Sequence, residues 1–285
     1  MNEWSKLNKI VVGNVISQKW PRDDEYFNHT ISASTWPIPF CYEIPLHVIN
    51  ETDEDLDMFC EVLDKEGVKV FRTKPGCYNA RDIVFTVGTR KFEAPSPFLY
   101  RRGEREKFSH IFSDVEIIDE GCFDAANLLR LNDKILYQIS YTGNVEGVDA
   151  LQRVLGNDFE VIGWDNELGH AHIDSTLMPL NESTLLCNGD RVREDSLPAF
   201  LKDFKKIWVE DVVPRDFHIF PYSSKWIGMN VLSIDPETVI VDSIQVPLKK
   251  QLESEGFRVL TSPLRHSRTL GGGHHCITLD LEREY

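Results

Sequence analysis

The sequence predicts an α/β fold built from about five ββαβ units that close around a common centre. Three observations lead to this prediction. β-Hairpin patterns recur along the chain, each is followed by a helical pattern and a further strand, and reactive residue types stand directly before the units. A unit of this kind cannot bury both of its faces alone, so its repetition implies stacking or closure about an axis.

The clearest units lie in the C-terminal half. Two apolar-rich runs flank a turn in each of three stretches, 127–140, 175–188 and 229–242, which is the pattern of a β-hairpin. The turn residues are polar, and the third turn also contains a proline. Helical patterns, with apolar residues three and four positions apart, follow at 147–156, 197–205 and 246–256. Strand patterns then close the three units at 159–164, 206–211 and 257–262.

The N-terminal half fits the same unit less cleanly. A helical pattern at 53–67 precedes a strand pattern at 68–72. Another unit comprises a hairpin at 81–95, a helical pattern at 103–112 and a strand at 115–119. Residues 17–45 read as an irregular loop. No linker rich in Pro, Gly or Ser divides the chain, so a single domain is expected over residues 1–285.

Composition limits the partners and the compartment. The 285 residues are 41% hydrophobic and 11% aromatic, which is ample for a core, and the net charge of −15 argues against nucleic acid or anionic membrane as a partner. The first residues lack the apolar core of a signal peptide, and no apolar run approaches the length of a membrane span. Six scattered cysteines without a CxxC pair favour a reduced, cytoplasmic protein without a disulfide framework.

The stretch LGGGHHC, which ends at Cys276, is the first candidate for chemistry. Glycine costs backbone entropy, so three in a row indicate tight turning or a close approach to another group. A thiol at the end of such a turn is positioned rather than simply packed. The stretch alone leaves three uses open: a metal ligand, a disulfide, or a nucleophile that attacks carbon.

The second candidate is GHAHIDSTL, residues 169–177. If this stretch is a strand, His170, His172 and Asp174 project from one face. Such a face suits a zinc or iron site, and it suits equally a base with a carboxylate for binding a cation. A polar strand edge without a function is the third reading.

The positions of these residues in the repeat favour the cation. Residues able to carry chemistry precede the first strand of most units: Arg81 and Asp82, Asp124, His172 and Asp174, Ser223 and Ser224, and His275 and Cys276. In a closed arrangement these strand starts converge on one centre. A centre rich in carboxylates with one His and one Cys suits a guanidinium ion, which donates five N–H groups in a fixed fork.

Four segments, CFDAANLLR, AHIDSTLMPL, SSKWIGMNVLSIDPETVIVDSIQVPLKKQLESEGF and LGGGHHC, resemble the amidinotransferases of the pentein superfamily, in particular the L-arginine:glycine enzymes. The resemblance runs from about residue 79 to residue 283 and is faint before that. It implies a five-bladed α/β propeller, in agreement with the count of units. It also implies Cys276 as the nucleophile, His172 as the general acid and base, and Asp124 as the acid that orients His172.

The resemblance further implies how the substrate is held. Asp82 and Asp174 are expected to grip the guanidinium of L-arginine, Arg191 to meet the carboxylate, and Ser223 and Ser224 to meet the amino-acid end. The expected partners are L-arginine and an amine acceptor, with glycine leading, and a homodimer is one possible assembly. Neither a cofactor nor a metal is expected.

The chain departs from the family pattern in three respects. The last position of the family's FDAAD motif is Asn127 here, which puts any substrate contact of that carboxylate in doubt. Ala171 stands where the glycine-accepting enzyme has a bulkier Met, so the pocket wall is lower. The chain is also shorter than typical members, mostly before Asp82 and before the CFDAAN motif, and a more open site would admit a different acceptor or water.

Other functions are therefore weighed beside the transferase. One is a hydrolase of the same superfamily, a deiminase or dihydrolase in which water replaces the amine. Another is a catalytically silent arginine-binding protein, which the presence of Cys276, His172 and Asp124 together disfavours. A zinc site of His170, His172 and Cys276 is a further alternative. His170 and His274 are interpreted as structural, whereas His275 adjoins the nucleophile and could tune it.

Overall fold

The computed structural model describes residues 2–20, 43–166, 171–218 and 221–284. The strands are β1 (Leu7–Val12), β2 (Lys69–Arg72), β3 (Val84–Val87), β4 (Arg90–Glu93), β5 (Glu116–Ile117), β6 (Leu128–Leu131), β7 (Lys134–Ile139), β8 (Glu160–Asp165), β9 (Leu177–Asn181), β10 (Thr184–Asn188), β11 (Lys205–Val209), β12 (Leu232–Asp235), β13 (Thr238–Asp242), β14 (Arg258–Ser262) and β15 (Thr278–Arg283). The α-helices are α2 (Leu46–Lys65), α3 (Val145–Leu155), α4 (Val246–Ser254) and α5 (Ser267–Leu270).

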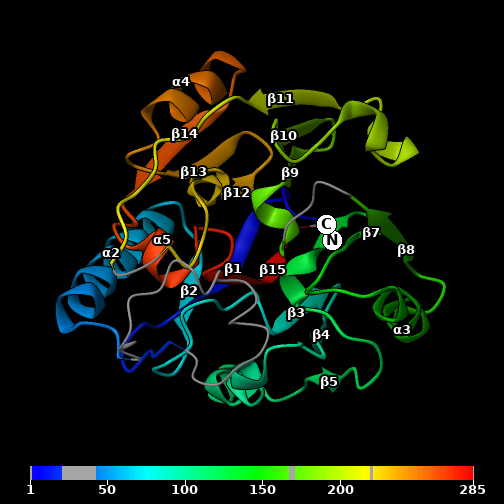
Figure 1. The fold of residues 1–285 in the computed structure, drawn as a ribbon, viewed down its shortest axis with the longest axis horizontal. Coiled ribbons are helices and arrows are strands. Elements are labelled where there is room, and N and C mark those ends of the chain that lie inside the picture. Colours follow the sequence, from blue (N-terminus) through cyan, green and yellow to red (C-terminus); the bar gives the residue numbers. More distant parts are fainter. Residues whose placement is uncertain (1, 21–42, 167–170, 219–220, 285) are drawn as a thin grey trace.

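The described strands form five sheets of three strands each (Figure 1). Their orders are β3-β4-β5, β6-β7-β8, β9-β10-β11, β12-β13-β14 and β15-β1-β2. In each sheet the first pair is antiparallel and the second pair is parallel. The predicted fivefold repeat of an α/β unit is therefore confirmed.

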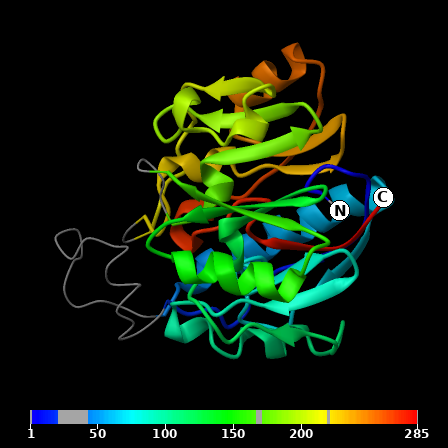
Figure 2. The ribbon, with the colours of Figure 1, turned by 90° about the vertical axis from the view of Figure 1, so that its right-hand side faces the viewer.

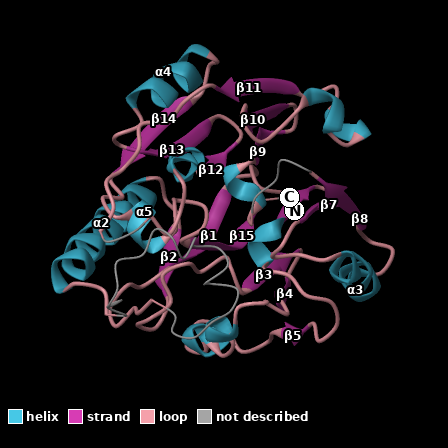
Figure 3. Ribbon diagram, viewed as in Figure 1, coloured by secondary structure: helices cyan, strands magenta, loops and turns pink. Residues whose placement is uncertain are grey.

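The fifth sheet is assembled from both ends of the chain. β1 pairs with β15 on one side, with Ile10 opposite Asp280, and with β2 on the other, with Ile10 opposite Val70. The two termini accordingly lie beside one another in both views of the ribbon (Figures 1 and 2). The helices α2, α3 and α4 lie at the periphery, outside the strands (Figure 3).

Burial explains why several strands do not alternate polar and apolar residues. All residues of β3, β6, β10 and β13 are buried, as expected for strands that are covered on both faces. Leu129, Leu186 and Val241, which come from three different sheets, belong to one apolar cluster. These three sheets therefore share one apolar cluster.

Two predicted helices are wrong. The stretches 197–205 and 103–112 contain the 3-10 helices Ala199–Leu201 and Glu104–Phe108 instead of α-helices. The apolar spacing in them is real, because Leu201 and Phe108 are fully buried, but it serves single turns. Apolar spacing over so few positions does not distinguish one buried turn from an α-helix of several turns. Of the loop predicted over 17–45, residues 21–42 lie outside the described residues.

Three further findings concern partners and covalent links. No helix in the described ranges is long and apolar enough to cross a membrane. The five cysteines that fall within them are free: Cys60, Cys77, Cys122, Cys187 and Cys276. Searched over the same residues, no group of three or more His, Cys, Asp or Glu side chains could hold a metal ion.

Candidate active site

The repeat brings the predicted residues together. Asp82, Asp124, Asp174 and Cys276 stand just before β3, β6, β9 and β15, the first strands of four sheets, and Ser224 precedes the 3-10 helix Lys225–Met229 that leads into β12. These starts surround a cavity of about 550 Å³. Its wall contains seven of the eight predicted site residues: Asp82, His172, Asp174, Arg191, Ser223, Ser224 and Cys276. Asp124 is buried behind His172.

The strand expected over 169–177 is wrong in its first part. His172 is extended and precedes a 3-10 helix at Ile173–Ser175, so β9 begins only at Leu177. His172 and Asp174 nevertheless both reach the cavity, because the tight turn projects them to the same side. His170, which the zinc alternative requires, lies outside the described residues.

His172 is held by a buried carboxylate. Its Nε2 lies 2.9 Å from Oδ2 of Asp124, and the other carboxylate oxygen of Asp124 accepts a hydrogen bond from the Ser96 hydroxyl. Burial opposes the imidazolium, but the charge of Asp82 and the hydrogen bond to Asp124 outweigh it and raise the pKa of His172 to about 9. His172 is therefore a proton donor at neutral pH.

Cys276 lies against a second carboxylate. Its thiol donates to Oδ2 of Asp174 at 3.2 Å, and the same oxygen lies 2.9 Å from Nδ1 of His275. Burial opposes the Asp174 carboxylate, but the contact with His275 lowers its pKa to about 2. Burial, Asp174 and Asp82 raise the pKa of Cys276 well above its usual value. A thiolate at Cys276 therefore needs an added cation in the cavity.

The three glycines are required by packing in this turn. A Cβ on Gly271 would lie 2.2 Å from the Tyr222 ring, and Gly271 also has a φ of +75°. A Cβ on Gly272 would lie 2.1 Å from Asn79 Oδ1, and one on Gly273 would lie 2.6 Å from Asn230 Cβ. The loop thus needs glycine to approach the surrounding side chains, and this approach sets the place of Cys276.

Asn230 is a site residue that the sequence reasoning missed. Its Oδ1 accepts from the backbone N–H of His275 at 2.9 Å and of Cys276 at 3.0 Å. Its Nδ2 donates to the Asp174 carbonyl at 3.2 Å. One amide therefore fixes the turn that bears the thiol to the turn that bears the neighbouring carboxylate. Its place in GMNVL, one turn after SSKW, was the available signal.

Arg101 is the second missed residue. Its Nη2 lies 2.5 Å from Oδ2 of Asp82, and its guanidinium lies over the Tyr100 ring at 5.0 Å. Arg101 lines the cavity and is buried. Burial nevertheless raises the pKa of Asp82 to about 6, although Arg101 opposes this rise. Arg101 lies in the 3-10 helix Leu99–Arg101, between the elements predicted from periodicity, so the pattern gave no signal for it.

Among the residues that the structure describes, two buried carboxylate oxygens accept no hydrogen bond from the protein. These are Oδ1 of Asp82 and Oδ1 of Asp174, while the Oδ2 atoms are held by Arg101 and His275 respectively. Buried polar atoms are usually hydrogen-bonded, so a carboxylate oxygen left free on a cavity wall is available to a donor on a ligand. Two such acceptors on the wall of one cavity suit a planar group that donates several N–H bonds, such as a guanidinium.

A cationic position lies farther along the wall. Arg191 is buried, its Nη2 donates to Oγ of Ser224 at 2.7 Å, and its Nη1 donates to Oγ of Ser175 at 3.0 Å. The Ser223 hydroxyl donates to the Ser267 carbonyl at 3.3 Å, which leaves its oxygen able to accept. The cavity therefore combines an acidic centre with a fixed guanidinium, as an amino acid with a cationic side chain requires.

The two departures from the family motifs differ in their consequences. Asn127 does not line the cavity: it is fully buried, donates to the Gln138 carbonyl at 3.1 Å and accepts from Thr142. Its role here is to fix the hairpin after Asp124. Ala171 does line the cavity, so its small side chain bears directly on the room for a ligand.

Comparison with known proteins gives the family. No protein-family model matches the chain. It is 32% identical over 338 aligned positions to inosamine-phosphate amidinotransferase 1 of Streptomyces glaucescens, and the match covers 99% of this chain and 95% of that relative. The mitochondrial glycine amidinotransferase of Xenopus tropicalis is 27% identical, with 99% of this chain and 82% of that relative covered. The chain belongs to the amidinotransferase family.

Solved structures agree. The inosamine-phosphate amidinotransferase of Streptomyces griseus superposes with a TM-score of 0.94 at 30% identity, over 100% of this chain and 96% of the other. A dimethylarginine dimethylaminohydrolase of Pseudomonas aeruginosa superposes with a TM-score of 0.70 at 16% identity, over 96% of this chain and 99% of the other, and shows the fold alone. The predicted pentein propeller is confirmed. The resemblance to the glycine enzymes in particular is weaker than predicted, because other amidinotransferases match at higher identity.

Replacing Gly273 with Ala tests whether the glycine turn positions the thiol. The added methyl group would overlap Asn230, which must then move and release the backbone N–H groups of His275 and Cys276. We therefore expect the rate at which iodoacetamide alkylates Cys276 to differ roughly severalfold between Gly273→Ala and the wild type. Peptide mass spectrometry measures this rate.

Gly189→Ala is the matched control. A Cβ at this glycine would make an ordinary contact of 3.6 Å with the Val209 carbonyl oxygen. Its alkylation rate should equal that of the wild type. Equal rates in both variants would show that the turn does not depend on Gly273.

Proposed function

We propose that this protein transfers the amidino group of L-arginine to an acceptor amine through a covalent intermediate on Cys276. The observation that carries the proposal is the shared cavity, in which Cys276 and His172 lie beside two unpartnered oxygens of Asp82 and Asp174. Arg191 on the same wall offers a partner for the carboxylate of the amino acid. Family membership supports the reaction class.

Binding of arginine is the first step. Its guanidinium donates N–H bonds to the free oxygens of Asp82 and Asp174, and its carboxylate meets Arg191, with Ser223 and Ser224 near the amino-acid end. The guanidinium carbon is a poor electrophile because resonance stabilises the cation. Orientation by two carboxylates therefore supplies part of the catalysis, and effects of this kind reach several kcal/mol. The bound cation also stabilises the thiolate that Cys276 must form.

The first half-reaction breaks the bond to the side-chain nitrogen of arginine. As arginine binds, the Cys276 thiol loses its proton to solvent, and the thiolate attacks the guanidinium carbon and forms a C–S bond. The C–N bond then breaks, and His172 gives its proton to the departing amine, so ornithine leaves and an amidino group remains on Cys276. The hydrogen bond from His172 to Asp124 holds the ring in place throughout.

The second half-reaction reverses these steps with another amine. Its nitrogen attacks the amidino carbon, His172 takes the proton that this nitrogen loses, and the C–S bond breaks to restore the thiolate. One residue serves as acid and then as base because the two half-reactions mirror each other.

Glycine is the acceptor that we propose, and guanidinoacetate is then the product. Its support is the resemblance of the sequence motifs to the L-arginine:glycine enzymes, whereas SSKW and LGGGHHC by themselves favour transfer over hydrolysis. Two of the relatives are named for other acceptors: one for inosamine phosphate and one for L-lysine. Ala171 leaves more room beside His172 than a larger side chain would, so these two acceptors belong in the same assay.

Product identification tests the reaction. With L-arginine and glycine we expect ornithine and guanidinoacetate in equal amounts, measured by mass spectrometry. Parallel reactions contain L-lysine, an inosamine phosphate, or no acceptor. Product from one of the other amines alone would replace glycine as the acceptor, whereas citrulline, or ornithine with urea and no acceptor, would show a hydrolase.

Cys276→Ala is the matched variant for this assay. It should lose turnover by several orders of magnitude, because no thiol remains to accept the amidino group. It should still bind arginine, since Asp82, Asp174 and Arg191 are intact. Calorimetric titration with arginine checks the second point. Turnover retained by this variant would refute the nucleophile assignment.

A pH profile tests the charges of the cavity. With pKa values of about 6 for Asp82 and about 9 for His172, the carboxylate and the imidazolium coexist between these two values. We expect kcat/KM for arginine to fall below about pH 6 as Asp82 gains a proton. In the arginine complex, where the bound cation stabilises the thiolate, kcat should fall above about pH 9 as His172 loses its proton. A basic limb that begins near the usual value for histidine would contradict the predicted charge on His172.

A further inference from the structure

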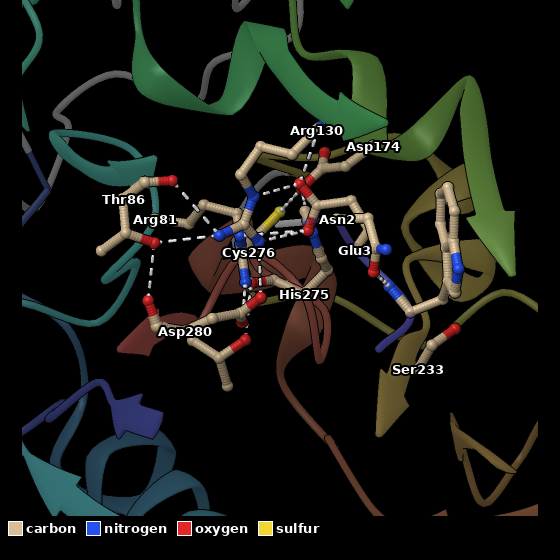
Figure 4. Close-up of polar contacts among 12 residues, drawn as sticks. Asn2, Glu3, Arg81, Thr86, Arg130, Asp174, Ser233, His275, Cys276 and Asp280 are labelled. Atoms are coloured by element: carbon tan, nitrogen blue, oxygen red, sulfur yellow. Dashed lines mark hydrogen bonds and ion pairs between the residues drawn. The ribbon is translucent and has the colours of Figure 1, made fainter. Parts of the chain in front are cut away.

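A buried ionic network lies directly behind the Cys276 turn (Figure 4). Glu3, close to the N-terminus, is 2% exposed, and its carboxylate accepts from Nε and Nη2 of Arg130 at 2.7 and 2.5 Å. Arg81 Nη1 lies 3.6 Å from the same carboxylate, and its Nη2 donates to Asp280 at 2.7 Å. The proposed reaction uses none of the four residues.

Backbone hydrogen bonds fix Glu3 to the neighbouring sheet. Glu3 donates its backbone N–H to the Arg130 carbonyl at 3.2 Å, and the Arg130 N–H donates to Oε1 of Glu3 at 3.0 Å. The next residue, Trp4, is buried in the largest apolar cluster. These contacts fix Glu3 against β6, so its carboxylate has a defined position.

His275 connects this carboxylate to the cavity. Its Nε2 lies 3.4 Å from Oε2 of Glu3, and its Nδ1 lies 2.9 Å from Oδ2 of Asp174. A nitrogen that faces a carboxylate oxygen has to donate, and a neutral imidazole has only one N–H. Both ring nitrogens of His275 face carboxylate oxygens, an arrangement whose hydrogen bonds an imidazolium satisfies and a neutral ring does not.

The His275 ring lies beside the thiol. The Asp174 oxygen that accepts from His275 Nδ1 is the one that accepts from the Cys276 thiol at 3.2 Å. The charged or titratable groups that face Cys276 are Asp174, Asp82 and the Tyr78 phenol, and those that face His275 are Asp174, Glu3 and Arg81. An imidazolium at His275 would therefore offset the charge of Asp174 where the thiolate must form.

We infer that Glu3 is a positioning residue for the nucleophile, because it keeps His275 doubly protonated and so favours the thiolate of Cys276. The inference rests on the proposed role of Cys276. It makes the N-terminal segment part of the active site although it is 273 positions away in the sequence. The direction in which the Cys276 pKa changes distinguishes this indirect action from direct electrostatic repulsion. The negative charge of Glu3 acting on the sulfur through space would disfavour a thiolate, whereas its action through His275 favours one.

Glu3→Gln tests the inference. The Gln amide keeps the shape of Glu3, but it has only one oxygen that can accept a hydrogen bond. If that oxygen accepts from Arg130, the NH₂ group faces His275 Nε2 as a second donor. Otherwise Arg130 and His275 must share the single oxygen. His275 then loses the Nε2 proton. We expect the pH midpoint of Cys276 alkylation by iodoacetamide, measured on the Cys276 peptide, to rise by about one pH unit. Arginine affinity in a Cys276→Ala background should not change.

Two further variants keep the test decisive. His275→Gln removes the cation without disturbing the contacts of Glu3 with Arg130, and it should raise the same midpoint. In that background Glu3→Gln should add no further shift, whereas a purely structural Glu3 would act equally in both. Glu282→Gln is the matched charge control, because Glu282 pairs with Lys9 on β1 near the surface, and its midpoint should equal that of the wild type.

The outcomes separate the inference from the proposed function. A midpoint that stays constant or falls in Glu3→Gln would overturn the role of Glu3, and so would an equal shift in the His275→Gln background. If the first variant does not fold, as judged by thermal unfolding, an unchanged midpoint in His275→Gln overturns it equally. Alkylation needs no substrate, so loss of transfer activity in the wild type would instead refute the proposed function.

Discussion

The structure depends on buried carboxylates that converge from different sheets with too few protein cations to satisfy every oxygen. Asp82, Asp124 and Asp174 stand at the starts of three first strands and are all buried. Taking a carboxylate out of water is costly unless it is paired and hydrogen-bonded. Arg101, His172 and His275 supply part of that pairing, and the two oxygens that remain define what the cavity can hold.

The same constraint explains the state of the thiol. Carboxylates around Cys276 disfavour a second negative charge, so the thiolate is stabilised only when cations are near. An imidazolium at His275 would be one such cation, and a guanidinium in the cavity would be the other. Reactivity of Cys276 would then rise when arginine binds, which restricts attack on other electrophiles.

Much of this could be predicted from the sequence because the repeat is local. The hairpins at 127–140, 175–188 and 229–242 have polar turns between apolar runs, and each formed as predicted. The residues before the first strands converge because closure of five units brings equivalent positions together. Single 3-10 turns, by contrast, leave no period to detect, so Arg101 and the conformation around His172 were missed. Glu3 was missed because only the pairing of β1 with β15 brings the N-terminus behind Cys276.

The most direct measurement is the mass of the protein, rapidly mixed with L-arginine in the absence of an acceptor and quenched in acid. The account predicts an amidino group on the peptide that contains Cys276, with one equivalent of ornithine released. Subsequent addition of the acceptor amine should remove it. Ornithine released while Cys276 stays unmodified, or an amidino group on another residue, would contradict the account.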